Sequence, residues 1–139
     1  MMRDLTGKVA WITGAGTGIG EAGAVALATA GMHVVLSGRR VEPLEAVASQ
    51  IEDNAWVQPL DVSDKDMVNS VAQAILEKYG RCDVLVNSAG LNVNKRNWHN
   101  VTLDDWDRVI RIDLDGAFLL LSSRAAHHDR KTLWPHYQL

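Results

Sequence analysis

Short apolar segments alternate with longer amphipathic segments along most of the chain. The apolar segments are 9–13, 33–37, 55–60 and 83–87, and continuous apolar runs of this length are typical of strands buried in a parallel sheet. The segments 19–30, 43–51, 63–79 and 102–121 instead place apolar residues at helical spacing. The pattern predicts four strands, each followed by a helix.

Local signals mark the ends of these helices. Gly31 is a natural stop for the first helix. Ser63 with Asp66, and Thr102 with Asp105, each have the spacing of a capping box and predict a helix start. The inward stripe expected for the last helix consists of Trp106, Val109, Ile110, Ala117 and Leu121.

Alternating strands and helices predict an α/β fold, a doubly wound parallel sheet of the Rossmann type. Right-handed crossovers favour the strand order 3-2-1-4 with helices on both faces. Ligands bind such sheets beyond the carboxyl ends of the strands, so the residues after each strand are the candidates for function. One partial domain over residues 1–126 accounts for the pattern.

Composition narrows the class of protein. The chain has 139 residues with a net charge of −3, which argues against nucleic acid and anionic membranes as partners. The longest uncharged run, residues 22–38, is too short to span a membrane. Cys82 is the single cysteine, and an internal disulfide is therefore impossible. We expect a cytoplasmic location.

A glycine-rich segment follows the first strand and leads directly into a helix. Its residues 13–20 read Thr-Gly-Ala-Gly-Thr-Gly-Ile-Gly. Glycines allow a tight turn whose N–H groups approach a pyrophosphate at the helix N-terminus. An ordinary glycine turn is the alternative, but the strand–turn–helix context favours phosphate binding. The candidate residues for such a contact lie within this segment.

Two arginines follow the second strand. Arg39 and Arg40 stand where an NAD site would place an acid for the ribose 2′-hydroxyl, and no acid lies between His33 and Val41. An arginine here suits the 2′-phosphate of NADP. The pair could also be an ordinary solvated loop. We favour NADP over NAD, with Arg39 as its ligand.

Three motifs together resemble the short-chain dehydrogenase/reductase family over residues 5–126. They are the glycine segment, Leu60-Asp61-Val62 after the third strand, and Asn87-Ser88-Ala89-Gly90 after the fourth, where the family usually has Asn-Asn-Ala-Gly. The resemblance implies that the pyrophosphate loop is shaped by Gly14, Gly18, Ile19 and Gly20, with Thr17 also in the cofactor site. It further implies that Asp61 and Val62 contact the adenine. It also implies that Asn87, Ala89 and Gly90 belong to the cofactor site, with Asn87 and Gly90 beside a ribose. Without the resemblance, Asp61 would be read as a turn acid.

One departure concerns the last helix. The family usually has a catalytic Asn in the middle of this helix, and Asp113 occupies that position. Asp113 also falls on the expected inward stripe, where a carboxylate is costly unless it is hydrogen-bonded or protonated. It could accept backbone N–H groups at a helix kink, or it could hold the water of a proton relay as the family's Asn does.

The second departure is the missing catalytic half. The resemblance implies a Ser and a Tyr-x-x-x-Lys motif after a fifth strand, yet neither Tyr79 nor Tyr137 is followed by a lysine four residues later. From Arg124 to Leu139 there are three basic residues and one acidic residue. Reading residues 128–139 one base later permits a sequence typical of the family's approach to its fifth strand. We interpret residues 127–139 as a divergent, out-of-frame tail.

The leading hypothesis is therefore a truncated short-chain dehydrogenase/reductase. The family reaction transfers a hydride between NAD(P)(H) and an alcohol or ketone substrate, and we expect this chain alone to be inactive. The alternative is a non-catalytic nucleotide-binding or interaction module. An uncovered fourth strand, together with Trp106, Ala117 and Leu121 on the last helix, predicts self-association or a homo-oligomer.

Overall fold

A four-stranded parallel sheet forms the centre of the molecule. The computed structural model describes residues 4–94 and 97–127. The strands are β1 (Val9–Thr13), β2 (His33–Ser37), β3 (Ala55–Val57) and β4 (Val84–Asn87). Their order is β3-β2-β1-β4, with every pair parallel. This confirms the predicted 3-2-1-4 topology.

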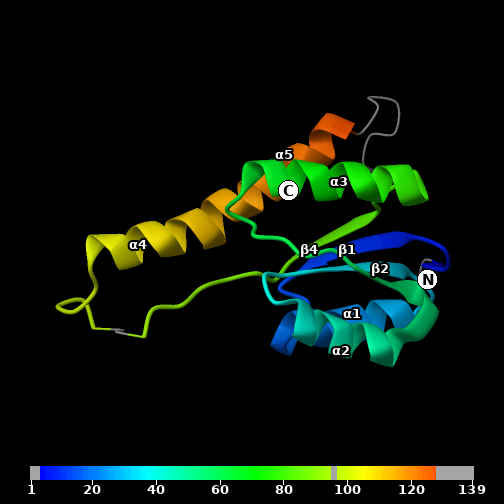
Figure 1. Cartoon of the computed structure of the whole chain (residues 1–139), viewed down its shortest axis with the longest axis horizontal. Coiled ribbons are helices and arrows are strands. Elements are labelled where there is room, and N and C mark those ends of the chain that lie inside the picture. Colours follow the sequence, from blue (N-terminus) through cyan, green and yellow to red (C-terminus); the bar gives the residue numbers. More distant parts are fainter. Residues whose placement is uncertain (1–3, 95–96, 128–139) are drawn as a thin grey trace.

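Helices cover both faces of the sheet (Figure 1). On one face lie α1 (Gly18–Thr29) and α2 (Val41–Ile51), and on the other lie α3 (Lys65–Tyr79) and α5 (Gly116–His127). Side chains of β1 alternate between the two cores: Ala10 and Ile12 pack with α1 and α2, whereas Val9 and Trp11 pack with the α3 and α5 side. All of β1 is buried, which explains its continuous apolar run.

The third strand is shorter than the predicted segment 55–60. It ends at Val57, although two further backbone bonds continue the pairing: Gln58 N–H donates to Leu36 O at 2.9 Å, and Leu60 N–H donates to Gly38 O at 3.0 Å. Pro59 lies between them and has no N–H to donate. These two bonds extend the pairing of residues 58–60 along β2 to the carboxyl end of β2.

One of the two predicted capping boxes is wrong. Helix α3 begins at Lys65 after a short turn, and Asp64 caps it by accepting the N–H groups of Asp66 and Met67. Ser63 donates its hydroxyl to Asp61 instead. At Thr102 the predicted box is confirmed, because Asp105 N–H donates to the Thr102 hydroxyl and Thr102 N–H donates to the Asp105 carboxylate.

The last helical segment contains a π turn. Helix α4 (Leu103–Val109) continues through π-helical Ile110–Asp115 into α5, and Gly116 N–H donates to Arg111 O, five residues back. The predicted inward stripe is wrong at both ends, since Trp106 is 50% and Leu121 is 52% exposed. The buried positions are Gly116, Leu120 and Ser123, because this side of the helix contacts Val62 and α3.

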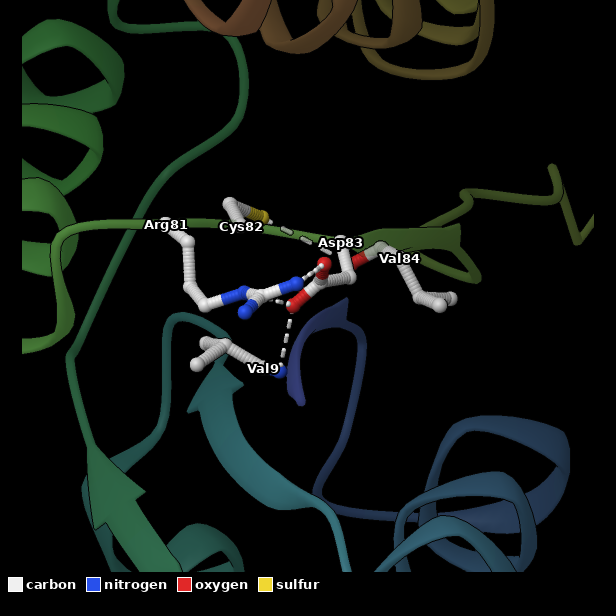
Figure 2. A network of polar contacts seen from close by, with 5 residues as sticks. All are labelled: Val9, Arg81, Cys82, Asp83 and Val84. Atoms are coloured by element: carbon white, nitrogen blue, oxygen red, sulfur yellow. Dashed lines mark hydrogen bonds and ion pairs between the residues drawn. The ribbon is translucent and has the colours of Figure 1, made fainter. Parts of the chain in front are cut away.

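Polar contacts fasten β4 to β1 at their amino ends (Figure 2). Asp83 N–H donates to Val9 O at 2.8 Å, and Val9 N–H donates to the Asp83 carboxylate at 2.9 Å. The Arg81 guanidinium holds the same carboxylate through two nitrogens. Burial by itself would raise the pKa of Asp83, but the bonds from Arg81 and Val9 outweigh it and lower that pKa. Within the ranges described, no helix has the length and apolarity needed to cross a membrane.

Candidate functional site

A pocket of about 320 Å³ opens at the carboxyl ends of the strands. It receives residues from the loops after β1, β2, β3 and β4, as expected for a doubly wound sheet. The predicted site residues that line it are Gly14, Thr17, Ile19, Arg39, Asp61, Val62, Ala89 and Gly90. Further lining residues include Gly38, Arg40, Ser88 and Ile112. Eight of the sixteen lining residues are therefore among the predicted site residues.

Three glycines shape the β1–α1 turn, at positions where a side chain would be strained or would clash. Gly14 has a φ of +64°, and a Cβ atom there would lie 2.7 Å from Ser88 O. Gly18 has a φ of +60° with open space around it. A Cβ atom at Gly20 would clash with Gly14 O. Gly14 therefore requires both a left-handed backbone and close contact with the loop after β4, whereas Gly18 requires only a left-handed backbone. Gly20 is required because its Cα lies against the backbone of the same turn.

Helix α1 presents its N-terminus at this turn. Thr17 is the N-cap residue in an extended conformation, and its side chain makes no capping hydrogen bond. The N–H groups of the first helical turn have no partner within a helix, and the helix dipole adds partial positive charge there. Thr17 and Ile19 also line the pocket. The turn can therefore accept an anionic group such as a pyrophosphate.

Thr13 connects the β1 and β4 ends beneath the pocket. Its buried hydroxyl donates to Val86 O at 3.4 Å and accepts the N–H of Ala89 at 3.3 Å. Asn87 is the last residue of β4 and pairs with Thr13 in the sheet. It is exposed but is not among the lining residues. The Asn-Ser-Ala-Gly segment is thus held at the pocket through Thr13.

Arginine and carboxylate side chains flank the pocket beside β2. Arg39 and Arg40 are exposed. Asp61 accepts the Ser63 hydroxyl at 2.7 Å and the Ser63 N–H at 2.9 Å. These bonds, the hydroxyl first, lower the pKa of Asp61, and the charge of Arg39 acts in the same direction. Asp61 is therefore a turn acid that also lines the pocket.

Asp113 is exposed, contrary to the expectation of a buried carboxylate. The inward face of this helix is formed instead by Gly116, Leu120 and Ser123, with partly buried Ile112 packed beside them. Its Oδ1 accepts the N–H of Leu91 at 2.7 Å, which fixes the loop after β4 to the helix. Gly90, a lining residue, is the neighbour of that N–H. Asp113 thus reaches the edge of the pocket through its hydrogen bond to the backbone of the loop after β4.

Sequence reasoning missed Gly116. A Cβ atom at this position would lie 2.8 Å from Cγ2 and 3.1 Å from Cβ of Val62. The helix therefore packs directly against a loop that forms one wall of the pocket. A glycine inside an otherwise regular amphipathic segment could have revealed this contact, because such a residue often marks a close approach.

Tyr79 lies away from this pocket. Its ring stacks on His33, the first residue of β2, with ring centroids 5.4 Å apart. The pocket is at the other end of that strand. Burial raises the pKa of Tyr79, the opposite of what proton transfer near neutral pH requires. Tyr137 lies outside the described residues, as does the tail after His127.

The family model for short chain dehydrogenases matches residues 8–132. The chain belongs to the short-chain dehydrogenase family. An uncharacterised oxidoreductase of Staphylococcus aureus (strain USA300) is 39% identical over 126 residues, which cover 90% of this chain and 53% of that protein. A D-threitol dehydrogenase of Mycolicibacterium smegmatis is also 39% identical, over 84% of this chain and 45% of the relative.

Solved structures of other proteins share the fold of this chain. A Brucella melitensis 3-ketoacyl-(acyl-carrier-protein) reductase complexed with NADH superposes with a TM-score of 0.84 at 36% identity, over 88% of this chain and 51% of that one. A metagenomic short-chain oxidoreductase in complex with NADP gives 0.83 at 38% identity, over 90% and 58%. The chain spans about half the length of the relatives it matches.

Proposed function

We propose that the pocket binds the dinucleotide NADP and that the protein is a dinucleotide-binding part of an alcohol/ketone oxidoreductase. The observation that carries this proposal is the glycine turn and free α1 N-terminus facing the same pocket as Arg39 and Asp61. Family neighbours complexed with NADH and with NADP support it. The bound cofactor would supply the hydride acceptor or donor.

Each loop would contact a different part of the cofactor. The turn containing Gly14, Gly18 and Gly20 would hold the pyrophosphate, with Thr17 and Ile19 beside it. Asp61 and Val62 would border the adenine. Asn87, Ala89 and Gly90 would border a ribose, and Asp113 would keep their loop in place through Leu91 N–H, 2.7 Å away. We assign Asp113 this positioning role ahead of a proton relay.

NADP is favoured over NAD because of charge. Arg39 and Arg40 lie on the pocket, and no acid of the β2 loop competes for a ribose hydroxyl. Calorimetric titration with each cofactor tests the preference. Arg39→Ala should weaken NADP binding about tenfold, the value of one charge-assisted bond, and should leave NAD affinity unchanged.

Two further variants make this titration decisive. Arg108→Ala removes an exposed arginine of α4 and should change neither affinity. Gly14→Val should abolish binding of both cofactors, because its side chain would enter the space of Ser88. Equal losses of NADP and NAD affinity in Arg39→Ala would contradict the assignment, whereas undiminished binding by Gly14→Val would contradict the site itself.

Binding by this chain should proceed without turnover. A positioned acid/base group contributes about 10²–10⁴ in rate, and Tyr79 is remote from the pocket. Mixing the chain with NADP and a panel of secondary alcohols should leave the near-ultraviolet absorbance of reduced cofactor at background. An increase that Gly14→Val removes would show that the chain contains its own catalytic group.

A further inference from the structure

Gly16 lines the pocket and lies against the first turn of α2. A Cβ atom at Gly16 would lie 2.9 Å from Cβ of Pro43 and 3.5 Å from the backbone nitrogen of Leu44. Gly16 is not among the glycines with a positive φ, so its backbone conformation gives no reason for a glycine. The Cβ atom of Pro43 cannot swing aside, because the ring fixes it to the backbone. Lack of space against α2 is therefore what requires a glycine at position 16.

The same turn of α2 also contacts the loop after β2. Leu44 is buried, and its Cδ2 would lie 3.6 Å from a Cβ atom at Gly38. Helices α1 and α2 lie side by side on one face of the sheet (Figure 1). Through Pro43 and Leu44, the first turn of α2 thus contacts both the glycine turn after β1 and the loop that carries Arg39.

A backbone hydrogen bond joins the same two parts of the chain below the pocket. Ala15 N–H donates to Ser37 O at 3.1 Å, and both residues are buried. The contact between Gly16 and Pro43 joins residues that line the pocket itself. These two points of contact together determine how far the glycine turn lies from the residues that follow β2.

We propose that the contact between Gly16 and Pro43 sets the separation between the two phosphate-binding ends of the pocket and thereby favours NADP over NAD. The inference rests on the proposed function, in which the glycine turn holds the pyrophosphate and Arg39 holds the 2′-phosphate. In NADP both groups are attached to the same ribose, so their separation is nearly fixed. A pocket that binds both must keep its two ends at the matching separation.

The position of Arg39 depends on the first turn of α2. Arg40 is the N-cap residue of α2, and Arg39 immediately precedes it. A side chain at position 16 would push this turn outward and would move Arg39 with it. Charge-assisted hydrogen bonds weaken when distance and angle depart from their optimum. Pro43 is therefore a positioning residue that acts through Arg39, and NAD, which lacks the 2′-phosphate, is much less sensitive to it.

Calorimetric titration of the whole chain with NADP and with NAD tests this inference. Gly16→Ala should weaken NADP binding about tenfold and NAD binding no more than about twofold, because only NADP loses a charge-assisted bond. Gly23→Ala in α1 is the matched control, since a Cβ there would meet nothing within 4 Å, and it should change neither affinity. A wild type that binds neither cofactor would overturn the proposed function and this inference with it. Equal losses of NADP and NAD affinity in Gly16→Ala would overturn this inference alone.

A second substitution at Pro43 shows whether the added carbon acts through this contact. Pro43→Gly removes the Cβ atom, after which the nearest atoms of α2 to an alanine at position 16 lie at 3.5 Å, an ordinary contact distance. Gly16→Ala/Pro43→Gly should therefore recover the preference for NADP. Gly16→Ala/Pro43→Ala keeps a Cβ atom at position 43 and should stay impaired. A lack of recovery with Pro43→Gly, or equal recovery with both, would overturn the inference.

Two further measurements separate positioning from a general loss of structure. In an Arg39→Ala background, Gly16→Ala should weaken NADP binding no more than NAD binding, because the residue through which the contact acts is absent. Pro43→Gly alone adds no atom that could prevent folding, and loss of the contact should lower the preference for NADP about threefold. A urea unfolding transition in each variant confirms that it folds. A tenfold loss specific to NADP in the Arg39→Ala background, or an unchanged preference in Pro43→Gly, would overturn the inference.

Discussion

Gly116 lies so close to Val62 that a single added carbon would reach Cγ2 at 2.8 Å. This contact joins the last helical segment to the loop that carries Asp61. A helix glycine normally destabilises by about 0.5–1 kcal/mol relative to alanine. The close approach of helix and loop explains why a glycine stands at position 116. The position of the pocket wall therefore depends on Gly116, which does not itself line the pocket.

Gly116→Ala should therefore destabilise the chain and distort the pocket. Overpacking costs about 1–3 kcal/mol, partly offset by the better helix propensity of alanine. We expect a net loss of about 1 kcal/mol in urea unfolding and a weaker affinity for NADP. The matched control is Gly23→Ala in α1, where a Cβ would meet nothing within 4 Å. Gly23→Ala should stabilise the chain, and equal effects of the two would contradict the packing argument.

The buried bond between Trp11 and Ser37 gives a second prediction. The Trp11 indole Nε1 donates to the Ser37 hydroxyl at 2.9 Å, and both residues are buried. Ser37→Ala should cost about 1–3 kcal/mol, because it leaves a buried N–H without its acceptor. In a Trp11→Phe background the same substitution should cost much less. Equal losses in both backgrounds, measured by chemical unfolding, would show that Ser37 acts by packing alone.

The strand order could be predicted from the sequence because the same signal, an apolar strand segment followed by a helix, occurs repeatedly. Four apolar segments of strand length, each followed by a helix, leave few arrangements once crossovers are right-handed. The residues after each strand then converge on one pocket by topology alone. Gly14, Arg39, Asp61 and Gly90 come from four separate loops and line the same space.

Competition between neighbouring side chains for hydrogen-bond partners was harder to predict from the sequence. Ser63 and Asp64 are both good N-cap residues, and the structure uses Asp64 because Asp61 takes the Ser63 hydroxyl. Likewise the apolar periodicity of the last helix did not reveal its π turn at Ile110–Asp115, within which Asp113 is exposed. These outcomes depend on side-chain partners that spacing does not reveal.

The Asp83 network in Figure 2 predicts a dependence of stability on pH. The pKa of Asp83 is lower in the folded chain, because the bonds from Arg81 and Val9 outweigh burial. Its contribution to stability is therefore complete above the unfolded pKa of about 3.9 and is lost as pH falls through the folded value. Part of the acid destabilisation below about pH 4 should come from this carboxylate.

Asp83→Asn tests this contribution. Arg81 is 54% exposed, so solvent screens the pair and we expect a loss of about 1 kcal/mol at neutral pH. The difference from wild type should shrink at pH values below the folded pKa, where wild-type Asp83 is also protonated. Asp53→Asn removes an exposed carboxylate elsewhere and serves as the control. A loss that stays constant down to low pH would contradict the assignment.

The outer edge of β4 gives the last prediction. In the described residues β4 pairs with β1 alone, and Val84, Leu85 and Val86 are only partly buried. By contrast, β1 lies between two strands and is fully buried. Amide groups on an open edge exchange through local opening, whereas those of a central strand need global unfolding. We expect β4 to exchange faster than β1, most clearly at N–H groups that point away from β1.

Hydrogen exchange on the purified chain, at a concentration where it sediments as a monomer, makes this comparison. Fast exchange in β4 of the monomer reports an open edge, which also predicts slow aggregation through strand pairing. Adding NADP should protect the loop after β4 without protecting its outer edge, since the pocket contacts only the carboxyl end of the strand. Protection of β4 equal to that of β1 in the monomer would mean that another segment of this chain pairs with β4, and the open edge would be excluded.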